Sequence, residues 1–277
     1  MNGYIKTTIL FSILTALFIT VGYFIGGTSG LIIMLIFSIV INFGTYWFSD
    51  KIAIKFAKAK PINKDDLGWI YDEIDILSKK MNIPTPKVYI SPSDQPNAFA
   101  TGRNKKNGVV CLTTGLISNL QRNEIRGVIA HELAHIKNND ILIATVAAVI
   151  AGVIASIGDL FIFNMIFGGN DEEGSNPIGT LLLIIIAPIA AVIIQLSISR
   201  TREYLADRTA AKFTGEPEAL ANALVKIESL VKINPMQTNP ALANLYIQNP
   251  ISIRGIGELF STHPPTAKRV KALMSLK

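Results

Sequence analysis

The sequence predicts an α+β chain that is mostly helical, with a small β-sheet or hairpin and about four transmembrane helices. Of the 277 residues, 49% are hydrophobic and only 17% are charged, which is too apolar for an ordinary soluble protein. The hydrophobic residues gather in long uncharged runs, and about 20 consecutive apolar residues suffice to cross a membrane. We therefore expect two hydrophobic hairpins that alternate with two polar segments, at residues 1–50, 51–140, 141–198 and 199–277.

The first hydrophobic region has no charged residue from Thr7 to Ser49. Small residues at Gly26–Gly30 interrupt it, so the sequence predicts two spans, roughly Thr8–Ile25 and Leu31–Phe48, joined by a short turn. A cleaved signal peptide would also begin with a basic residue and an apolar run. The immediate return of a second span disfavours that alternative.

Two further runs, Ile141–Phe167 and Gly174–Ser199, predict a second pair of spans. Buried helices of a soluble core are the alternative. Both runs are longer than such helices usually are, and neither has a polar face. Asp159 lies near the far end of the first run, which favours solvation at the membrane interface over a role as a relay.

The basic residues predict the orientation. Of 26 Lys and Arg, 14 lie between Lys51 and Lys137 and 11 lie from Arg200 onward, whereas neither loop within a hairpin contains one. Cytoplasmic segments of membrane proteins carry such an excess. We therefore expect a multi-pass protein of the plasma membrane with both polar segments and both termini in the cytoplasm. The net charge of +6 fits this topology and nearby anionic lipid; no nucleic-acid motif is visible.

The first polar segment predicts a helix followed by a small sheet. Apolar residues recur at helical spacing within Asp65–Met81, and prolines follow. Lys87–Ile90 predicts a strand, and the extended segment Asn97–Gly102 predicts a hairpin with Val109–Thr113. Cys111, the single cysteine, lies in this last strand, so we expect a buried side chain and not a nucleophile.

The edge of such a hairpin can bind an extended peptide as an added strand. The residues we expect to take part are Asn97, Ala98, Phe99 and Ala100. An ordinary structural hairpin is the open alternative.

His131, Glu132 and His135 form an HExxH motif in a helix predicted over Asn119–Asn139. Residues i and i+4 share one helix face, so both imidazoles can reach one metal ion while Glu132 faces the attacking water. The flanking residues are apolar, and polar groups in a buried helix are costly unless they have partners. A pair of ordinary core histidines is the alternative, which fits two histidines worse than one.

Two histidines leave a catalytic zinc one protein ligand short of the usual three. The spacing of metzincins would place a glycine at position 138 and a histidine at position 141, but Asn138 and Ile141 stand there. Glu203 is the better candidate, and Asp207 one turn later can hold a ligand imidazole. An acidic helix face among arginines is the alternative interpretation of this pair.

Four features together resemble the HtpX family of integral-membrane zinc metalloproteases, which belongs with the type I CAAX prenyl proteases among the gluzincins. These features are the HExxH motif, Glu203-x-x-x-Asp207, the Asn97–Gly102 segment, and the segment Ser261–Pro265 with Arg269. The resemblance runs over nearly the whole chain. One departure is Asn138-Asn139-Asp140 after the motif, where small residues are frequent in the family.

The resemblance implies a zincin-type α+β protease domain with one Zn²⁺ per chain, held by His131, His135 and Glu203. It implies Glu132 as the general base, Asp207 as the acid behind the ligands, and His263 as a stabiliser of the tetrahedral intermediate. The implied substrates are polypeptides, above all misfolded or damaged membrane proteins hydrolysed at the cytoplasmic face. The alternatives are prenyl-peptide processing of the CAAX type, or a non-catalytic membrane protein with a structural zinc.

Overall fold

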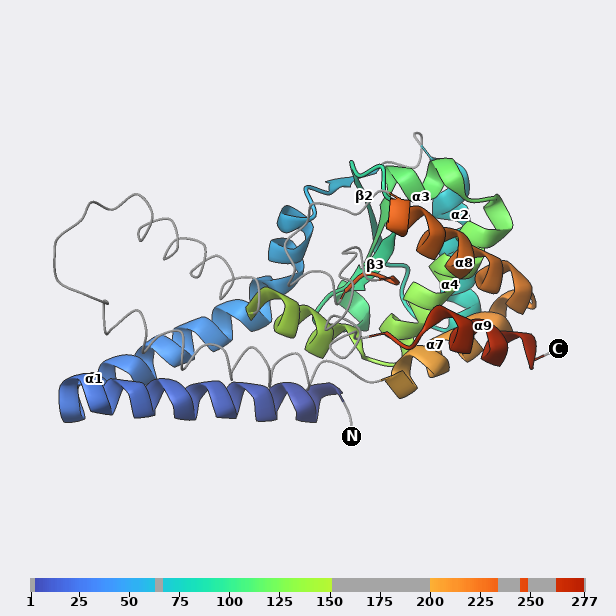
Figure 1. The fold of residues 1–277 in the computed structure, drawn as a ribbon. Helices are drawn as coiled ribbons and strands as arrows, with labels where there is room; N and C mark the ends of the chain where they lie inside the picture. The colour runs from blue at the N-terminus through green and yellow to red at the C-terminus, as the bar shows by residue number, and fades with distance from the viewer. Residues whose placement is uncertain (1–2, 63–66, 151–199, 234–244, 249–262, 277) are drawn as a thin grey trace, which may run out of the picture.

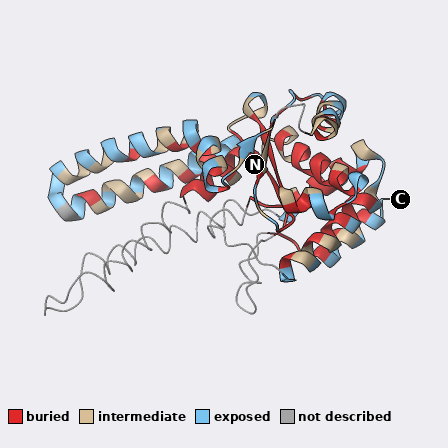
Figure 2. Ribbon diagram, turned by 90° about the horizontal axis from the view of Figure 1, so that it is seen from above, coloured by how far each residue is buried: buried red, intermediate tan, exposed pale blue. Residues whose placement is uncertain are grey.

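The computed structural model describes residues 3–62, 67–150, 200–233, 245–248 and 263–276. A long helical hairpin projects from a globular part in which helices surround a small sheet (Figure 1). Exposed residues cover most of the hairpin, whereas buried residues gather in the globular part (Figure 2). Of the predicted second hydrophobic hairpin, only the helical segment Ile141–Ile150 is described; Asp159 lies outside the described residues.

The hairpin is α1, Gly3–Phe56, which consists of two helices joined at Gly26 and Gly27. Gly27 has φ 56° and ψ −141°, a conformation that residues with a side chain rarely adopt, so the chain can reverse there. Its two arms, Tyr4–Phe24 and Gly26–Phe56, are long and apolar enough to cross a membrane. The first predicted pair of hydrophobic helices is therefore present.

The turn of this hairpin is tighter than the sequence predicts. Only two of the five residues in Gly26–Gly30 are non-helical, and the second helix continues beyond Phe48 to Phe56. Gly30 lies where the two helices pack and not in the turn, because a Cβ atom on Gly30 would collide with the carbonyl oxygen of Gly22. The two arms therefore approach each other closely next to the turn.

The sheet has four strands, in the order β1-β2-β4-β3. These are β1 Lys60–Pro61, β2 Lys87–Ser91, β3 Ala98–Thr101 and β4 Val109–Thr113. The predicted hairpin is the antiparallel pair β3 and β4, while β2 lies parallel to β4 on its other side. β3 is consequently an edge strand. Cys111 in β4 is buried, as predicted.

Helices cover this sheet and form the main core. They are α2 Gly68–Met81, α3 Thr114–Asn119, α4 Arg122–Lys137, α7 Arg200–Thr214, α8 Pro217–Ile233 and α9 Thr266–Met274. Helix α4 lies at the centre, where it contacts α2, α7, α8 and β3. A Cβ atom on Gly127 would lie 3.0 Å from the backbone of Leu220, so glycine lets α4 and α8 pack closely. Leu133 and Ile129 of α4 are completely buried in this core.

Helix α4 begins three residues later than predicted, because Asn119 belongs to α3 and the chain turns between the two helices. Its first turn is capped by Glu124, whose carboxylate accepts a hydrogen bond of 2.8 Å from the backbone N–H of Gln121. Lys226 of α8 lies 2.7 Å from the same carboxylate. These contacts fix the N-terminal end of the helix that carries HExxH.

At its other end, α4 is followed by the helical segment Ile141–Ile150 at an angle of 92°. This segment packs against the first arm of α1, where Leu10 and Leu14 are buried beside Ile143 and Val146. The helix that carries the histidines is thus connected directly to the apolar helices.

Candidate metal centre

Three potential ligands from two helices converge in the structure. His131 and His135 lie one turn apart on α4, and their Nε2 atoms are 3.1 Å from each other. Glu203, in the first turn of α7, has one carboxylate oxygen 3.6 Å from His131 Nε2 and the other 3.5 Å from His135 Nε2. The structure therefore brings together all three ligands that the sequence predicts.

These separations fit a single bound cation. Ligand atoms at about 2.0–2.1 Å from a tetrahedral ion lie roughly 3.3–3.5 Å from one another. The three atoms found here all lie within 4.8 Å of one another. Two imidazole nitrogens that face each other with their lone pairs repel unless a cation or a proton lies between them. The donor set of two histidines and one carboxylate thus suits a metal ion.

Asp207 lies behind His131 and fixes its ring. The carboxylate is 2.9 Å from His131 Nδ1, so that nitrogen carries the proton and donates it to Asp207. Burial lowers the pKa of His131 to about 4, although the contact with Asp207 acts to raise it. The ring is consequently neutral at pH 7, with its Nε2 lone pair directed toward the other ligands.

Arg269 of α9 completes this arrangement. It is fully buried and donates two hydrogen bonds to Asp207, of 2.8 Å from Nε and 2.7 Å from Nη2. Although burial opposes ionisation of Asp207, the charge and hydrogen bonds of Arg269 hold its pKa at about 2. The Nη1 atom of Arg269 is also 3.6 Å from Glu203. One arginine therefore contacts carboxylates from two successive turns of α7.

Glu132 lies between the two histidines on α4 and is 1% exposed. Its Oε1 atom has no hydrogen-bond partner among the described residues. Burial raises the pKa of Glu132 to about 7, and the negative charge of Glu203 adds to that rise. A carboxylate with this pKa can accept a proton and release it again near neutral pH.

His135 has a carboxylate behind it as well. Asp140, just beyond the end of α4, lies 3.4 Å from His135 Nδ1. Burial alone would lower the pKa of His135, but the contact with Asp140 and the charge of Glu203 raise it to about 9. The surroundings of this ring thus favour a positive charge at the place where a cation would bind.

The third histidine of the chain reaches the same cluster. His263 Nδ1 lies 3.0 Å from Oε2 of Glu203, and both side chains are largely buried. Burial alone would raise the pKa of Glu203, but the charge of His263 and its hydrogen bond keep the pKa well below its ordinary range. Glu203 is consequently ionised, as a metal ligand must be.

The predicted substrate strand lies next to this centre. β3 is buried along its whole length, and Ala100 donates a backbone hydrogen bond to Glu132. Its outer edge is partly occupied by the described segment Leu245–Gln248, hereafter the edge segment. The backbone N–H of Ile247 donates to the carbonyl of Ala98 over 2.9 Å.

Side chains hold the edge segment in place. Asn97 donates to the backbone carbonyl of Gln248 over 2.9 Å. The ring of Phe99 packs edge-on against Tyr246, with centroids 5.2 Å apart. Arg269 donates to the carbonyl of Ile247 over 3.1 Å, so the edge segment also contacts the arginine behind the candidate ligands.

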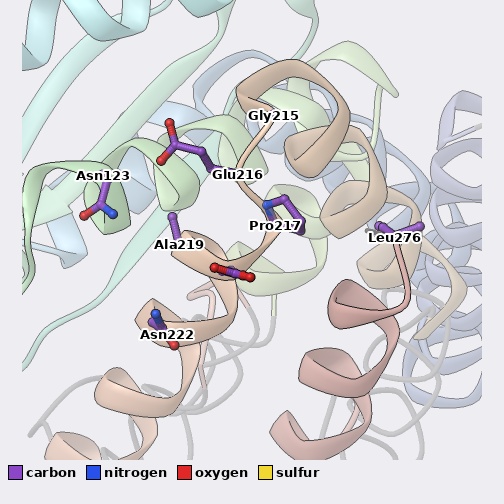
Figure 3. Close-up of a pocket in the computed structure, with 8 residues that line it drawn as sticks. Asn123, Gly215, Glu216, Pro217, Ala219, Asn222 and Leu276 are labelled. Atoms are coloured by element: carbon purple, nitrogen blue, oxygen red, sulfur yellow. The ribbon is translucent and has the colours of Figure 1, made fainter.

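A separate pocket of about 380 Å³ lies where α7 meets α8 (Figure 3). Its lining includes Asn123, Glu216, Pro217 and Leu276, and none of the clustered histidines. Asn123 is at the opposite end of α4 from His135, and the two residues are about 18 Å apart along the helix axis. This pocket is therefore distinct from the candidate metal centre.

Sequence reasoning missed two residues of the centre. It assigned no role to Asp140 and noted Arg269 only as part of a motif. Asn139 is a recognisable signal for Asp140, because asparagine often adopts the left-handed conformation that ends a helix. Arg269 has no such signal in the sequence, since its partners lie on α7 and in the edge segment.

Two apolar helices beside a centre of two histidines and one glutamate define the class of this chain, an integral-membrane metalloprotease. The chain belongs to peptidase family M48, whose model matches residues 65–277. Two proteins described as protease HtpX homologs, from Persephonella marina and Thermococcus sibiricus, are each 46% identical to it. The alignments cover 98% and 99% of this chain and 96% of each relative.

The fold has a solved counterpart. The crystal structure of Ste24p from S. mikatae superposes with a TM-score of 0.50 at 22% sequence identity, over 97% of this chain and 67% of that protein. The similarity supports the arrangement of helices and sheet described above.

Proposed function

We propose that this protein is a zinc-dependent endopeptidase that hydrolyses misfolded or damaged membrane proteins at the cytoplasmic face of the plasma membrane. The observation that carries the proposal is the convergence of His131, His135 and Glu203, whose ligand atoms lie within 4.8 Å of one another. The relatives described as protease HtpX homologs support proteolysis as the activity.

Zinc is the metal we propose, one ion per chain. Two imidazoles and one carboxylate are a ligand set of catalytic zinc sites, which leave the fourth position for water or substrate. When bound, zinc polarises the scissile carbonyl as a Lewis acid and lowers the pKa of water toward 7. Asp207 holds His131 in the tautomer that such binding requires, over 2.9 Å.

The protein's own residues carry out the proton transfers. Glu132, buried and with one carboxylate oxygen unpartnered among the described residues, accepts the proton of the attacking water. It then returns this proton to the departing amine. His263 donates a hydrogen bond to the oxygen of the tetrahedral intermediate, which is consistent with its location 3.0 Å from Glu203.

The substrate is proposed to add to β3 in an extended conformation, through Asn97, Ala98, Phe99 and Ala100. The edge position of β3 and the hydrogen bond between Ala100 and Glu132 support this. Because Ile247 already donates to the carbonyl of Ala98, a substrate that pairs with Ala98 has to displace the edge segment.

For the topology, we propose membrane hairpins at residues 1–50 and 141–198 and cytoplasmic protease segments at 51–140 and 199–277. The two apolar arms of α1 support the first hairpin. The concentration of Lys and Arg in the two polar segments supports a cytoplasmic location for them.

The test is purification of the full chain in detergent, followed by metal analysis and a casein cleavage assay. We expect one zinc per chain, cleavage that stops when a chelator removes it, and recovery when zinc is restored. Cleavage that survives complete metal removal would contradict the proposal, and a bound zinc without any cleavage would favour a structural role. Preference for a farnesylated peptide over its unmodified form would instead indicate prenyl-peptide processing.

A further inference from the structure

The end of helix α4 has a specific geometry that directs the next residue back toward the metal centre. Asn139 adopts a left-handed conformation with φ 59°. Its backbone N–H bonds to the carbonyl of Ile136 over 3.2 Å, and the N–H of Asp140 bonds to the carbonyl of His135 over 3.0 Å. This pair of bonds is a Schellman motif, which ends a helix by turning the chain back over its last turn.

Asp140 contacts His135 through both its backbone and its side chain. The backbone N–H of Asp140 is bonded to the carbonyl of His135, and its Oδ2 atom lies 3.4 Å from Nδ1 of the same histidine. Two contacts between one pair of residues restrict the orientation of the imidazole, because the turn fixes the backbone of Asp140 beside the ring.

Both oxygens of the Asp140 carboxylate lie close to groups of the metal centre. Asp140 directly precedes the helical segment Ile141–Ile150, whose N-terminal end favours an acidic side chain, whereas the C-terminal end of α4 disfavours one. Its Oδ2 atom faces His135 Nδ1, Nη1 of Arg202 lies 3.8 Å from Oδ1, and the side chain is 13% exposed. Arg202 directly precedes Glu203 on α7, so this contact also links the two ligand-bearing helices.

The two ligand histidines therefore have matching surroundings. Nδ1 of His131 faces Asp207, which contacts Arg269, and Nδ1 of His135 faces Asp140, which contacts Arg202. Such carboxylates fix the ring and its tautomer and raise the basicity of the nitrogen that binds the metal.

We infer that Asp140 is a positioning residue for the metal ligand His135, held in place by the Schellman motif at Asn139. The inference rests on the proposed function, because it assigns Asp140 to the same metal site. Substitution of Asp140 is consequently expected to weaken zinc binding itself and to change the geometry of the site.

The experiment is a zinc titration of the metal-free full chain in detergent, in competition with a chromophoric chelator. We expect Asp140→Ala to weaken zinc affinity by about 10- to 100-fold, and Asp140→Asn to weaken it less, because the amide still accepts a hydrogen bond. Asp75→Ala is the matched control, since Asp75 also lies in a local contact, 2.6 Å from Lys79, but on α2. The control should bind zinc within twofold of the unsubstituted chain.

Cobalt substitution separates positioning from general destabilisation. Replacing zinc by Co²⁺ should give a visible absorption spectrum that changes in the Asp140 variants and not in Asp75→Ala. If Asp140→Ala does not fold, the same comparison is made with Asp140→Asn, which keeps the backbone turn. If the Asp140 variants bind zinc as tightly as the unsubstituted chain and give the same cobalt spectrum, the inference about Asp140 is overturned, whereas the proposed function is not. An unsubstituted chain that binds no zinc would overturn the proposed function and this inference with it.

Discussion

Arg269 donates to both carboxylate oxygens of Asp207, over 2.7 and 2.8 Å, and both side chains are almost completely buried. Such a pair is costly to break, because removal of one partner leaves the other as an uncompensated buried charge. Since Asp207 also holds His131, the pair connects the stability of the fold to the metal centre.

Arg269→Ala is therefore expected to destabilise the protein by about 3–5 kcal/mol. For a chain of this size, that loss lowers the midpoint of thermal unfolding by about 10 °C. The measurement is thermal unfolding of the metal-free chain in detergent, which removes the contribution of zinc. Lys79→Ala is the control, because Lys79 pairs with Asp75 at an exposed position and should cost about 1 kcal/mol or less. Equal losses in the two variants would contradict the assignment.

Glu132→Gln is expected to keep zinc bound and to reduce peptide cleavage by about 10²- to 10⁴-fold, because the amide cannot accept the proton of water. Casein cleavage and metal content are measured on the same preparation. Glu228→Gln serves as the control, since Glu228 forms a surface pair with Lys232. Cleavage at the normal rate would remove Glu132 from the mechanism.

The pH dependence of cleavage should follow the protonation of Glu132. Burial raises the pKa of this carboxyl to about 7, and a bound cation opposes that rise. The base is active only when ionised, so kcat/KM should fall as the pH decreases, with a midpoint at or below about pH 7. Zinc content is determined at each pH, so that loss of metal is not mistaken for protonation. If kcat/KM instead increases as the pH decreases, while zinc remains fully bound, this prediction is refuted.

Glu203→Ala is expected to lower zinc occupancy, because two imidazoles remain where three ligands are needed. Metal analysis after dialysis against a weak chelator measures the loss, and Glu216→Ala provides a surface control on the neighbouring loop. Full zinc occupancy in Glu203→Ala would assign the third ligand to another residue.

His263→Ala is expected to reduce kcat by about 10²- to 10³-fold with little change in zinc content, as for loss of a donor to the oxyanion. Because His263 also lies 3.0 Å from Glu203, a second result is informative. Loss of zinc in this variant would indicate that His263 positions the ligand and does not contact the substrate.

The convergence of His131, His135 and Glu203 could be predicted from the sequence because its signals are local. Spacing within one helix places His131 and His135 on the same face, whatever surrounds that helix. Glu203 and Asp207 are likewise separated by one turn. Only their distance from the histidines had to come from the structure.

The rest of the centre depends on contacts between segments far apart in the sequence. Ile247 pairs with Ala98 and Arg269 with Asp207, and no periodicity marks either partner. The sheet illustrates the same limit, because the hairpin of β3 and β4 is predicted, whereas the parallel pairing of β4 with β2 is not. Hydrophobic pattern fixes which face of an element is buried and leaves its neighbour undetermined.

The right angle between α4 and the helical segment Ile141–Ile150 has a mechanical consequence. Only Asn138, Asn139 and Asp140 separate the two helices, and Thr145 is hydrogen-bonded to Thr101 of β3 over 2.9 Å. A displacement of this segment would therefore act on His135 and on the edge strand together. Because apolar helices tilt to match the thickness of the surrounding bilayer, we expect detergent micelles and bilayers of differing thickness not to be equivalent solvents for the reaction.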